Sequence, residues 1–183
     1  MKNWKKKPNF LFWSGILLVS IGVGIFYVKN HQSIVVLNST SVSHNLNSPT
    51  PSFSYAKVTK IIDGDTFVID TGQHVRYIGV NTPEIETNEC YATEAGEINE
   101  DMIIGREVRL EKDTSDTDKY GRLLRYVYVD EGSDGWEMVN NELVKIGLAK
   151  VETVPPDTKH KNDFANSENY AKENKLGLWG KCL

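Results

Sequence analysis

Residues that could act on a phosphate ester are concentrated in four short stretches of this chain. They are DGDT at 63–66, Arg76 followed by NTPE at 81–84, DKYGR at 118–122 and, more loosely, GLAKV at 147–151. Together, the first three stretches supply carboxylate, amide and guanidinium groups. These are the groups that phosphodiester hydrolysis needs.

The chemistry of that reaction explains the choice of side chains. Negative charge develops on the phosphoryl oxygens, so fixed cations must surround the phosphorus. Arginine suits this task because its planar fork pairs two phosphate oxygens, and Arg76 and Arg122 are the candidates. A carboxylate must orient the attacking water, and a metal ion can polarise the phosphoryl oxygen. Asp65, the Asn81 side chain and the Thr82 carbonyl are oxygen donors of the kind that Ca²⁺ prefers.

Each stretch also has a purely structural interpretation. DGDT alone is a common turn sequence. Arg76 alone could be a surface residue of a strand, Glu84 could begin a solvated acidic loop, and KYGR could be a charged entry to a hairpin. The combination of the stretches, in this order, favours the functional interpretation: a metal-assisted phosphodiesterase.

The elements that must position these residues are short strands and three helices. Alternating patterns predict strands over residues 55–62, 66–70, 74–80, 107–112 and 123–129, with a short extended piece at 149–151. Helical patterns followed by a glycine, at Gly105, Gly147 and Gly177, predict helices over residues 94–104, 139–146 and 162–174. Tight turns without a βαβ rhythm argue against a parallel sheet. We therefore expect a five-stranded OB-type Greek-key barrel with three helices packed on it.

Two local expectations concern individual side chains. Alternation over residues 74–80 places Val75 and Tyr77 on one face, and Arg76 and Ile78 on the other. His160 lies in a charged loop, where we expect it to be solvated. We do not expect His74 to bind a metal, because no second His or Cys lies at ligand spacing.

The N-terminal third predicts a membrane anchor. Residues 10–28 contain no charged residue, and their length is close to the roughly 20 residues that span a bilayer as a helix. The lysines within residues 1–9 predict that this end is cytoplasmic. The Ser- and Asn-rich residues 29–52 predict a flexible tether to a domain at 53–183. A cleaved signal peptide is the alternative, although the run is long and no A-x-A-like site follows it.

Charge and cysteine content limit the possible functions further. The chain holds 21 basic and 25 acidic groups, and residues 1–52 contain five lysines and no acid. The domain at 53–183 therefore has 16 basic and 25 acidic groups, a net charge of −9. Nonspecific binding of nucleic acid through a basic surface is excluded, so a phosphate site must be local. The two cysteines, Cys90 and Cys182, could form a disulfide outside the cytoplasm or remain buried thiols.

Residues 55–182 resemble the staphylococcal nuclease (thermonuclease) family. The resemblance is carried by five motifs in the family's order, namely KIIDGDT at 60–66, RYIGVNTPE at 76–84, DKYGRLLRYVY at 118–128, MVNNELVKIGLAKV at 138–151 and LGLWG at 176–180. The resemblance implies the same OB-type barrel with three helices.

The resemblance also implies roles for single residues. Arg76 and Arg122 match the two arginines that stabilise the transition state, and Glu84 matches the glutamate assigned as general base. Asp65, Asn81 and Thr82 match the calcium ligands, Thr82 through its backbone carbonyl. Lys119 and Tyr120 match residues that contact a terminal phosphate of a bound nucleotide. Cys90 and Cys182 match a cysteine pair of some members, which implies a disulfide.

Two departures from the family pattern affect the expected activity. Asn81 replaces an aspartate, which removes a charge from the calcium site and predicts weaker calcium binding. ETVPP at 152–156 replaces tyrosines that lie near the bound base, which predicts a weaker hold on substrate.

The sequence as a whole predicts a Ca²⁺-dependent, extracytoplasmic nuclease that acts on DNA and RNA with little sequence preference. We expect it to be a monomer held in the cell membrane by one helix, or secreted if the N-terminal segment is cleaved. The alternative is a catalytically silent module that binds nucleic acid at the surface.

Overall fold

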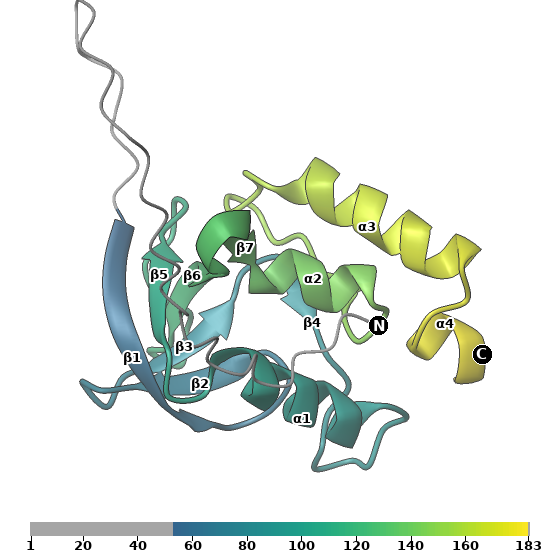
Figure 1. The fold of residues 1–183 in the computed structure, drawn as a ribbon, viewed down its shortest axis with the longest axis horizontal. Helices are drawn as coiled ribbons and strands as arrows, with labels where there is room; N and C mark the ends of the chain where they lie inside the picture. Colours follow the sequence, from purple (N-terminus) through teal and green to yellow (C-terminus); the bar gives the residue numbers. More distant parts are fainter. Residues whose placement is uncertain (1–52, 183) are drawn as a thin grey trace, which may run out of the picture. The chain divides into compact units, whose positions relative to one another are not determined.

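The structure is a computed structural model that describes residues 53–182 (Figure 1). The strands are β1 (Phe53–Ile61), β2 (Thr66–Ile69), β3 (His74–Tyr77), β4 (Val80–Asn81), β5 (Glu107–Glu111), β6 (Leu123–Asp130), β7 (Trp136–Met138) and β8 (Lys150–Val151). The helices are α1 (Ala92–Ile103), α2 (Val139–Lys145), α3 (Lys161–Glu173) and α4 (Leu178–Lys181), with a 3₁₀ turn, η1, at Gly132–Asp134.

Five of the strands close into a barrel. The long strand β1 pairs antiparallel with β2 on one side and with β5 on the other. β2 continues to β3 and β5 continues to β6, both antiparallel. A parallel pairing of β3 with β6, in which Arg76 lies opposite Leu124, completes the ring. The prediction of a five-stranded barrel with three helices is confirmed.

The barrel interior follows from alternation along the strands. Val58, Phe67, Val75, Val108 and Val127 are each at most 1% exposed, and each comes from a different strand of the ring. Successive side chains of a strand point to opposite faces, so the inward residues form one continuous apolar core. The remaining inward residues of the strands fill the same core.

Two buried asparagines connect the helices to the barrel. Asn99 of α1 accepts a hydrogen bond from the Tyr77 hydroxyl (2.7 Å) and donates one to the Asp63 carbonyl (3.0 Å). Asn140 of α2 accepts from the Val127 amide (2.9 Å) and donates to the Ile78 carbonyl (3.0 Å). Buried amides need such partners, and here they fix the two loops that carry the site.

The strand predicted over residues 74–80 is interrupted, contrary to expectation. β3 ends at Tyr77, and the chain turns at Gly79, whose φ is +81°. Val80 and Asn81 then form β4, which pairs with β8 instead. The turn buries Ile78 (3% exposed) beyond the end of β3, so strand alternation no longer relates its side chain to that of Arg76. The short strand β7 and the four-residue helix α4 were also not predicted.

Gly79 is essential to this turn, and substitution by alanine tests the point. A Cβ there would lie 2.4 Å from the Phe164 ring, in a backbone conformation that L-residues rarely adopt. We expect Gly79→Ala to lower the free energy of unfolding by about 2–4 kcal/mol, through strain and overpacking together. Gly72→Ala is the matched control, because Gly72 has φ +83° but no heavy atom within 4 Å of a Cβ. Urea unfolding should show about 1 kcal/mol for the control. Equal losses in the two variants would contradict the packing argument.

The predicted N-terminal segments, residues 1–9, 10–28 and 29–52, lie outside the described residues. Across residues 53–182, helices are too short or too polar to cross a bilayer.

Candidate active site

Asp65 lies at the entrance to β2, where the DGDT loop holds it in a buried position (4% exposed). Its backbone amide donates to the Asp63 carboxylate (2.9 Å). One carboxylate oxygen of Asp65 accepts from the Thr66 hydroxyl (3.2 Å), and the other accepts from the Thr82 amide (2.8 Å) and hydroxyl (3.0 Å). A Cβ on Gly64 would lie 2.7 Å from the Thr82 hydroxyl oxygen, so only glycine allows this approach. The loop before β2 and the end of β4 are thereby joined.

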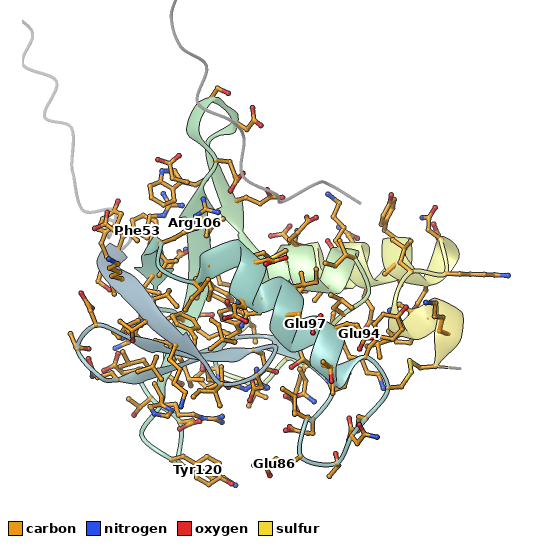
Figure 2. The ribbon with its side chains drawn as sticks, turned by 60° about the horizontal axis from the view of Figure 1, so that its bottom comes forward. Phe53, Glu86, Glu94, Glu97, Arg106 and Tyr120 are labelled. Carbon is orange, nitrogen blue, oxygen red and sulfur yellow. A yellow bond between two sulfur atoms is a disulfide. The ribbon has the colours of Figure 1, made fainter. Side chains whose placement is uncertain are left out.

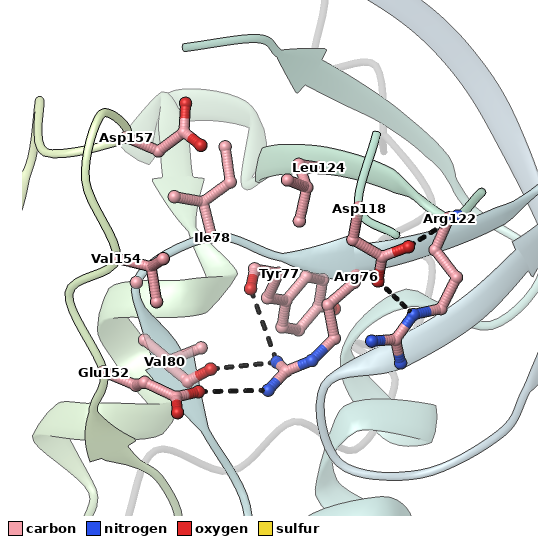
Figure 3. Close-up of a pocket in the computed structure, with 11 residues that line it drawn as sticks. Arg76, Tyr77, Ile78, Val80, Asp118, Arg122, Leu124, Glu152, Val154 and Asp157 are labelled. Atoms are coloured by element: carbon pink, nitrogen blue, oxygen red, sulfur yellow. Dashed lines mark hydrogen bonds and ion pairs between the residues drawn. The ribbon is translucent and has the colours of Figure 1, made fainter. Parts of the chain in front are cut away.

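Arg76 extends from β3 between the two predicted metal-ligand side chains. Its Nη1 lies 2.8 Å from the Asp65 carboxylate and donates to the Val80 carbonyl (2.9 Å). Its Nη2 donates to the Asn81 side-chain oxygen (2.8 Å). The same nitrogen lies 3.8 Å from the Glu152 carboxylate (Figure 3). The Arg76 side chain is 13% exposed. Asp65 and Asn81 therefore already converge on one positive charge.

Burial raises the pKa of Asp65 to about 6, and the nearby Arg76 guanidinium only partly offsets that rise. The folded pKa exceeds the unfolded value of 3.8, so the protonated form favours the fold. The stability that Asp65 contributes is complete below pH 3.8 and is lost as the pH rises through 6. The surrounding residues thus compensate the charge of the ionised form only in part.

Asp65→Asn removes this titrating group and should therefore change how the free energy of unfolding depends on pH. In metal-free buffer, the unfolding free energy of Asp65→Asn relative to wild type should rise by about 2 kcal/mol between pH 4 and pH 7. Other titrating groups cancel in this difference. Urea unfolding at several pH values measures it. A difference that does not change with pH would show that burial leaves Asp65 unperturbed.

Arg122 approaches the site from the residue before β6. Its Nε lies 2.7 Å from an oxygen of Asp118, whose other oxygen accepts from the Tyr120 and Arg122 amides (2.9 and 3.0 Å). Burial raises the pKa of Asp118, but these hydrogen bonds outweigh it and the net shift is downward. Among residues 53–182, Nη1 and Nη2 of Arg122 have no hydrogen-bond or ion-pair partner. One edge of the guanidinium is anchored and the other is available to a ligand.

Arg76 and Arg122 line the same pocket, which has a volume of about 220 Å³ (Figure 3). The parallel pairing of β3 with β6 places Arg76, in β3, beside the start of β6, which Arg122 immediately precedes. Besides the arginines, the lining includes Asp118, Leu124 and Glu152. The pocket can receive an anion between two guanidinium groups.

The other predicted site residues, Glu84, Lys119 and Tyr120, lie in exposed loops. Glu84 follows Thr82 by two residues, and its backbone amide donates to the Glu89 carboxylate (3.2 Å). Tyr120 is 72% exposed, and the Lys119 ammonium lies 4.9 Å from the centre of its ring. Figure 2 places Tyr120 and Glu86, a member of the Glu84 loop, toward the same end of the molecule. The structure brings Asp65, Arg76, Asn81 and Thr82 into contact; Glu84, Lys119 and Tyr120 do not line the pocket.

The donor atoms present suit a hard cation. Within residues 53–182, no three His, Cys, Asp or Glu side chains cluster as a metal site. The candidate set is instead one buried carboxylate, Asp65, with the amide oxygen of Asn81 and the carbonyl of Thr82. Ca²⁺ accepts such mixed oxygen ligands together with water. The contact of one guanidinium with both Asp65 and Asn81 shows that these oxygens can face a shared cation.

Several contributors were missed or misplaced by sequence patterns. Asp118 and Glu152 take part in the site only because of their contacts with arginines. His160 is not solvated as expected: its ring packs edge-on against Tyr126 at 4.5 Å, and its Nδ1 lies 3.1 Å from Asp163. The contacts of Glu152 with Arg76 and of His160 with Tyr126 depend on tertiary packing. Those of Asp118 with Arg122 and of His160 with Asp163 are local, but the sequence motifs do not give their geometry.

Cys90 and Cys182 form a disulfide in the structure. The bond joins the segment just before α1 to the end of α4. Among residues 53–182 there is no free cysteine. The expected pairing is therefore present.

The closed barrel and its arginine-lined pocket define a small OB-type domain of the nuclease class. The family described as staphylococcal nuclease homologue matches residues 74–181. The thermonuclease of Staphylococcus hyicus is 35% identical over 173 residues, which cover 91% of this chain and 96% of that protein. The thermonuclease of Staphylococcus intermedius is 34% identical over 90% of this chain and 94% of its own length. The endonuclease YncB of Bacillus subtilis is 43% identical over 67% of this chain and 60% of its own length.

The chain belongs to the staphylococcal nuclease family. The resemblance inferred from the motifs is confirmed, and the enzyme class is that of hydrolases acting on phosphodiester bonds.

Proposed function

We propose that this protein is a Ca²⁺-dependent nuclease that hydrolyses DNA and RNA with little sequence preference. The observation that carries the proposal is the convergence of Arg76 and Arg122 on one pocket, next to the buried carboxylate of Asp65. Two guanidinium groups suit the charge of a phosphodiester in its transition state. The pocket lining combines aliphatic residues with the two arginines, which supports contact with the phosphate backbone that all sequences share.

The chain's own residues account for most of the mechanism. Arg76 and Arg122 pair with the phosphoryl oxygens and neutralise the charge that develops there. Glu84, on the exposed loop, orients or deprotonates the water that attacks phosphorus in line. Asp118 holds Nε of Arg122, so that its terminal nitrogens face the ligand without a large loss of side-chain entropy. Asp65, Asn81 and the Thr82 carbonyl would hold calcium, which supplies further polarisation of the phosphoryl oxygen.

Calcium binding should be weak, because the amide of Asn81 brings no charge to the site. We expect an affinity in the millimolar range, suited to extracellular calcium, from isothermal titration of the wild-type protein. Asn81→Asp restores a carboxylate and should tighten binding by about tenfold or more. Submicromolar binding by the wild type would contradict this prediction.

The proposed location is the outer side of the cell membrane, with the protein acting as a monomer. The uncharged run at 10–28 and the lysines before it support an anchor with a cytoplasmic N-terminus. The Cys90–Cys182 disulfide supports an oxidising compartment for the domain. Secretion after cleavage of the N-terminal segment would satisfy the same observations.

A digestion assay tests the proposed activity directly. The purified full chain is incubated with single-stranded and double-stranded DNA and with RNA, with calcium or with a chelator, alongside Glu84→Gln and Arg122→Ala. We expect calcium-dependent fragmentation by the wild type and strong loss in both variants. A folded wild type that binds nucleic acid without cutting it would favour the silent binding module instead.

A further inference from the structure

Glu152 is a pocket residue that no motif singled out for chemistry. It follows β8 by one residue, and its backbone amide donates to the Gly79 carbonyl (3.0 Å). In the β4–β8 pair, Val80 lies opposite Val151 and Asn81 lies opposite Lys150. Because side chains alternate between faces, Glu152 lies on the same face as Asn81. Gly79, directly across from Glu152, has no side chain to obstruct it.

This placement brings the Glu152 carboxylate to the guanidinium of Arg76. Nη2 of Arg76 lies 2.8 Å from the Asn81 oxygen and 3.8 Å from the Glu152 carboxylate. Among residues 53–182, Asp65 and Glu152 are the acids in ion-pair range of Arg76. The Asp65 side chain is 6% exposed, whereas that of Glu152 is 55% exposed. Glu152 is thus the loosely held partner, located on the pocket side of Arg76 (Figure 3).

The other two acids that line the pocket, Asp118 and Asp157, already have close partners. Asp118 pairs with Arg122 at 2.7 Å. Asp157 accepts from the backbone amides of Thr114 and Ser115 (2.9 and 2.7 Å). A phosphate that enters to pair with Arg76 therefore meets one acid that can move toward or away from it, namely Glu152.

We infer that Glu152 is a specificity-determining residue that disfavours terminal phosphates relative to internal phosphodiesters, an inference that rests on the proposed nuclease function. An internal diester carries one negative charge, whereas a terminal monoester carries close to two at neutral pH. A carboxylate that shares Arg76 with the bound phosphate repels it in proportion to that charge. At about 6 Å in water, the repulsion weakens binding about threefold for one charge and about tenfold for two. The pocket therefore favours cleavage within a strand over binding at its phosphorylated end.

The test compares two ligands that differ by one charge. They are thymidine 5′-monophosphate and its methyl ester, titrated into the full chain at pH 7.5 without metal and followed by NMR. We expect Glu152→Gln to tighten binding of the monophosphate about tenfold and of the methyl ester about threefold. A residue with a purely structural role would not tighten binding when substituted. Glu107→Gln is the control for net charge, because Glu107 is exposed, lies in β5 opposite Lys57 of β1 and does not line the pocket.

Three results would overturn the inference: equal shifts for both ligands, weaker binding of both, or no binding by either protein. The digestion assay is separate from this measurement. If affinity shifted with ligand charge but the wild type cut no nucleic acid, the role of Glu152 in anion selection would stand and the proposed nuclease function would be wrong. If the wild type digested nucleic acid but Glu152→Gln left the ratio of the two ligand affinities unchanged, only the role of Glu152 would be wrong.

Discussion

Arg122→Ala should reduce kcat for nucleic-acid cleavage by about 10²–10³-fold, because removal of one positioned donor to a transition-state oxyanion has an effect of that size. The fold should survive the change. The Arg122 side chain is 30% exposed, and its partner Asp118 keeps the hydrogen bonds from the Tyr120 and Arg122 amides. Initial rates of DNA digestion at saturating substrate, together with thermal unfolding of each protein, measure the two quantities.

Two further variants show whether the geometry of the guanidinium matters. Arg122→Lys keeps the charge but loses the planar fork, so it should recover only part of the lost rate. Arg106→Ala removes an arginine whose contacts are the Met102 and Asp130 carbonyls and Glu131, away from the pocket. It should lose stability and keep its rate per folded molecule. An Arg122→Ala protein with the wild-type rate would remove this residue from the mechanism.

Replacing both cysteines should give the largest loss of stability of the changes considered for this domain. The Cys90–Cys182 bond closes a loop with a sequence separation of 92 residues, which contains all four helices and the barrel strands β5 and β6. Chain-entropy arguments assign about 4–5 kcal/mol to a loop of this length. Urea unfolding of Cys90→Ser/Cys182→Ser should therefore show a loss near that value.

Reduction provides the control for that experiment. The reduced wild type should unfold at the same urea concentration as the double variant, and the variant should not respond to reductant. Cys90 follows Glu84 by six residues, so the bond also limits the motion of the loop that carries the proposed base. If reduction left the unfolding midpoint of the wild type unchanged, the bond would have no part in the stability of the domain.

Much of the barrel could be inferred from local patterns. The alternation of Val108 with Leu110, and of Val127 with Val129, predicts strands because side chains on a pleated strand alternate between core and solvent. Glycines after the first two helical stripes predicted where those helices end. Short strands with tight turns then left few architectures, and the five-stranded barrel was among them.

For the candidate site, the sequence predicted which residues take part but not which residues they contact. The identities of Asp65, Arg76 and Arg122 followed from the chemistry that a phosphodiester requires. Their partners did not follow. The sequence did not predict the ion pair of Asp65 with Arg76 or its hydrogen bonds with Thr82. The contact of Arg122 with Asp118 depends on the conformation of the turn at residues 118–122. A sequence motif does not give the distances within such a turn.

The sequence by itself determined the family and the barrel and predicted the reacting side chains, because periodicity, turn residues and ordered motifs are local properties of the chain. Tertiary structure alone decided that Glu152 reaches Arg76, that His160 packs on Tyr126 and that the chain turns at Gly79. The first contact depends on β4 and β8, two-residue strands too short to have a recognisable pattern. The other two depend on which surfaces remain to be covered once the barrel has closed.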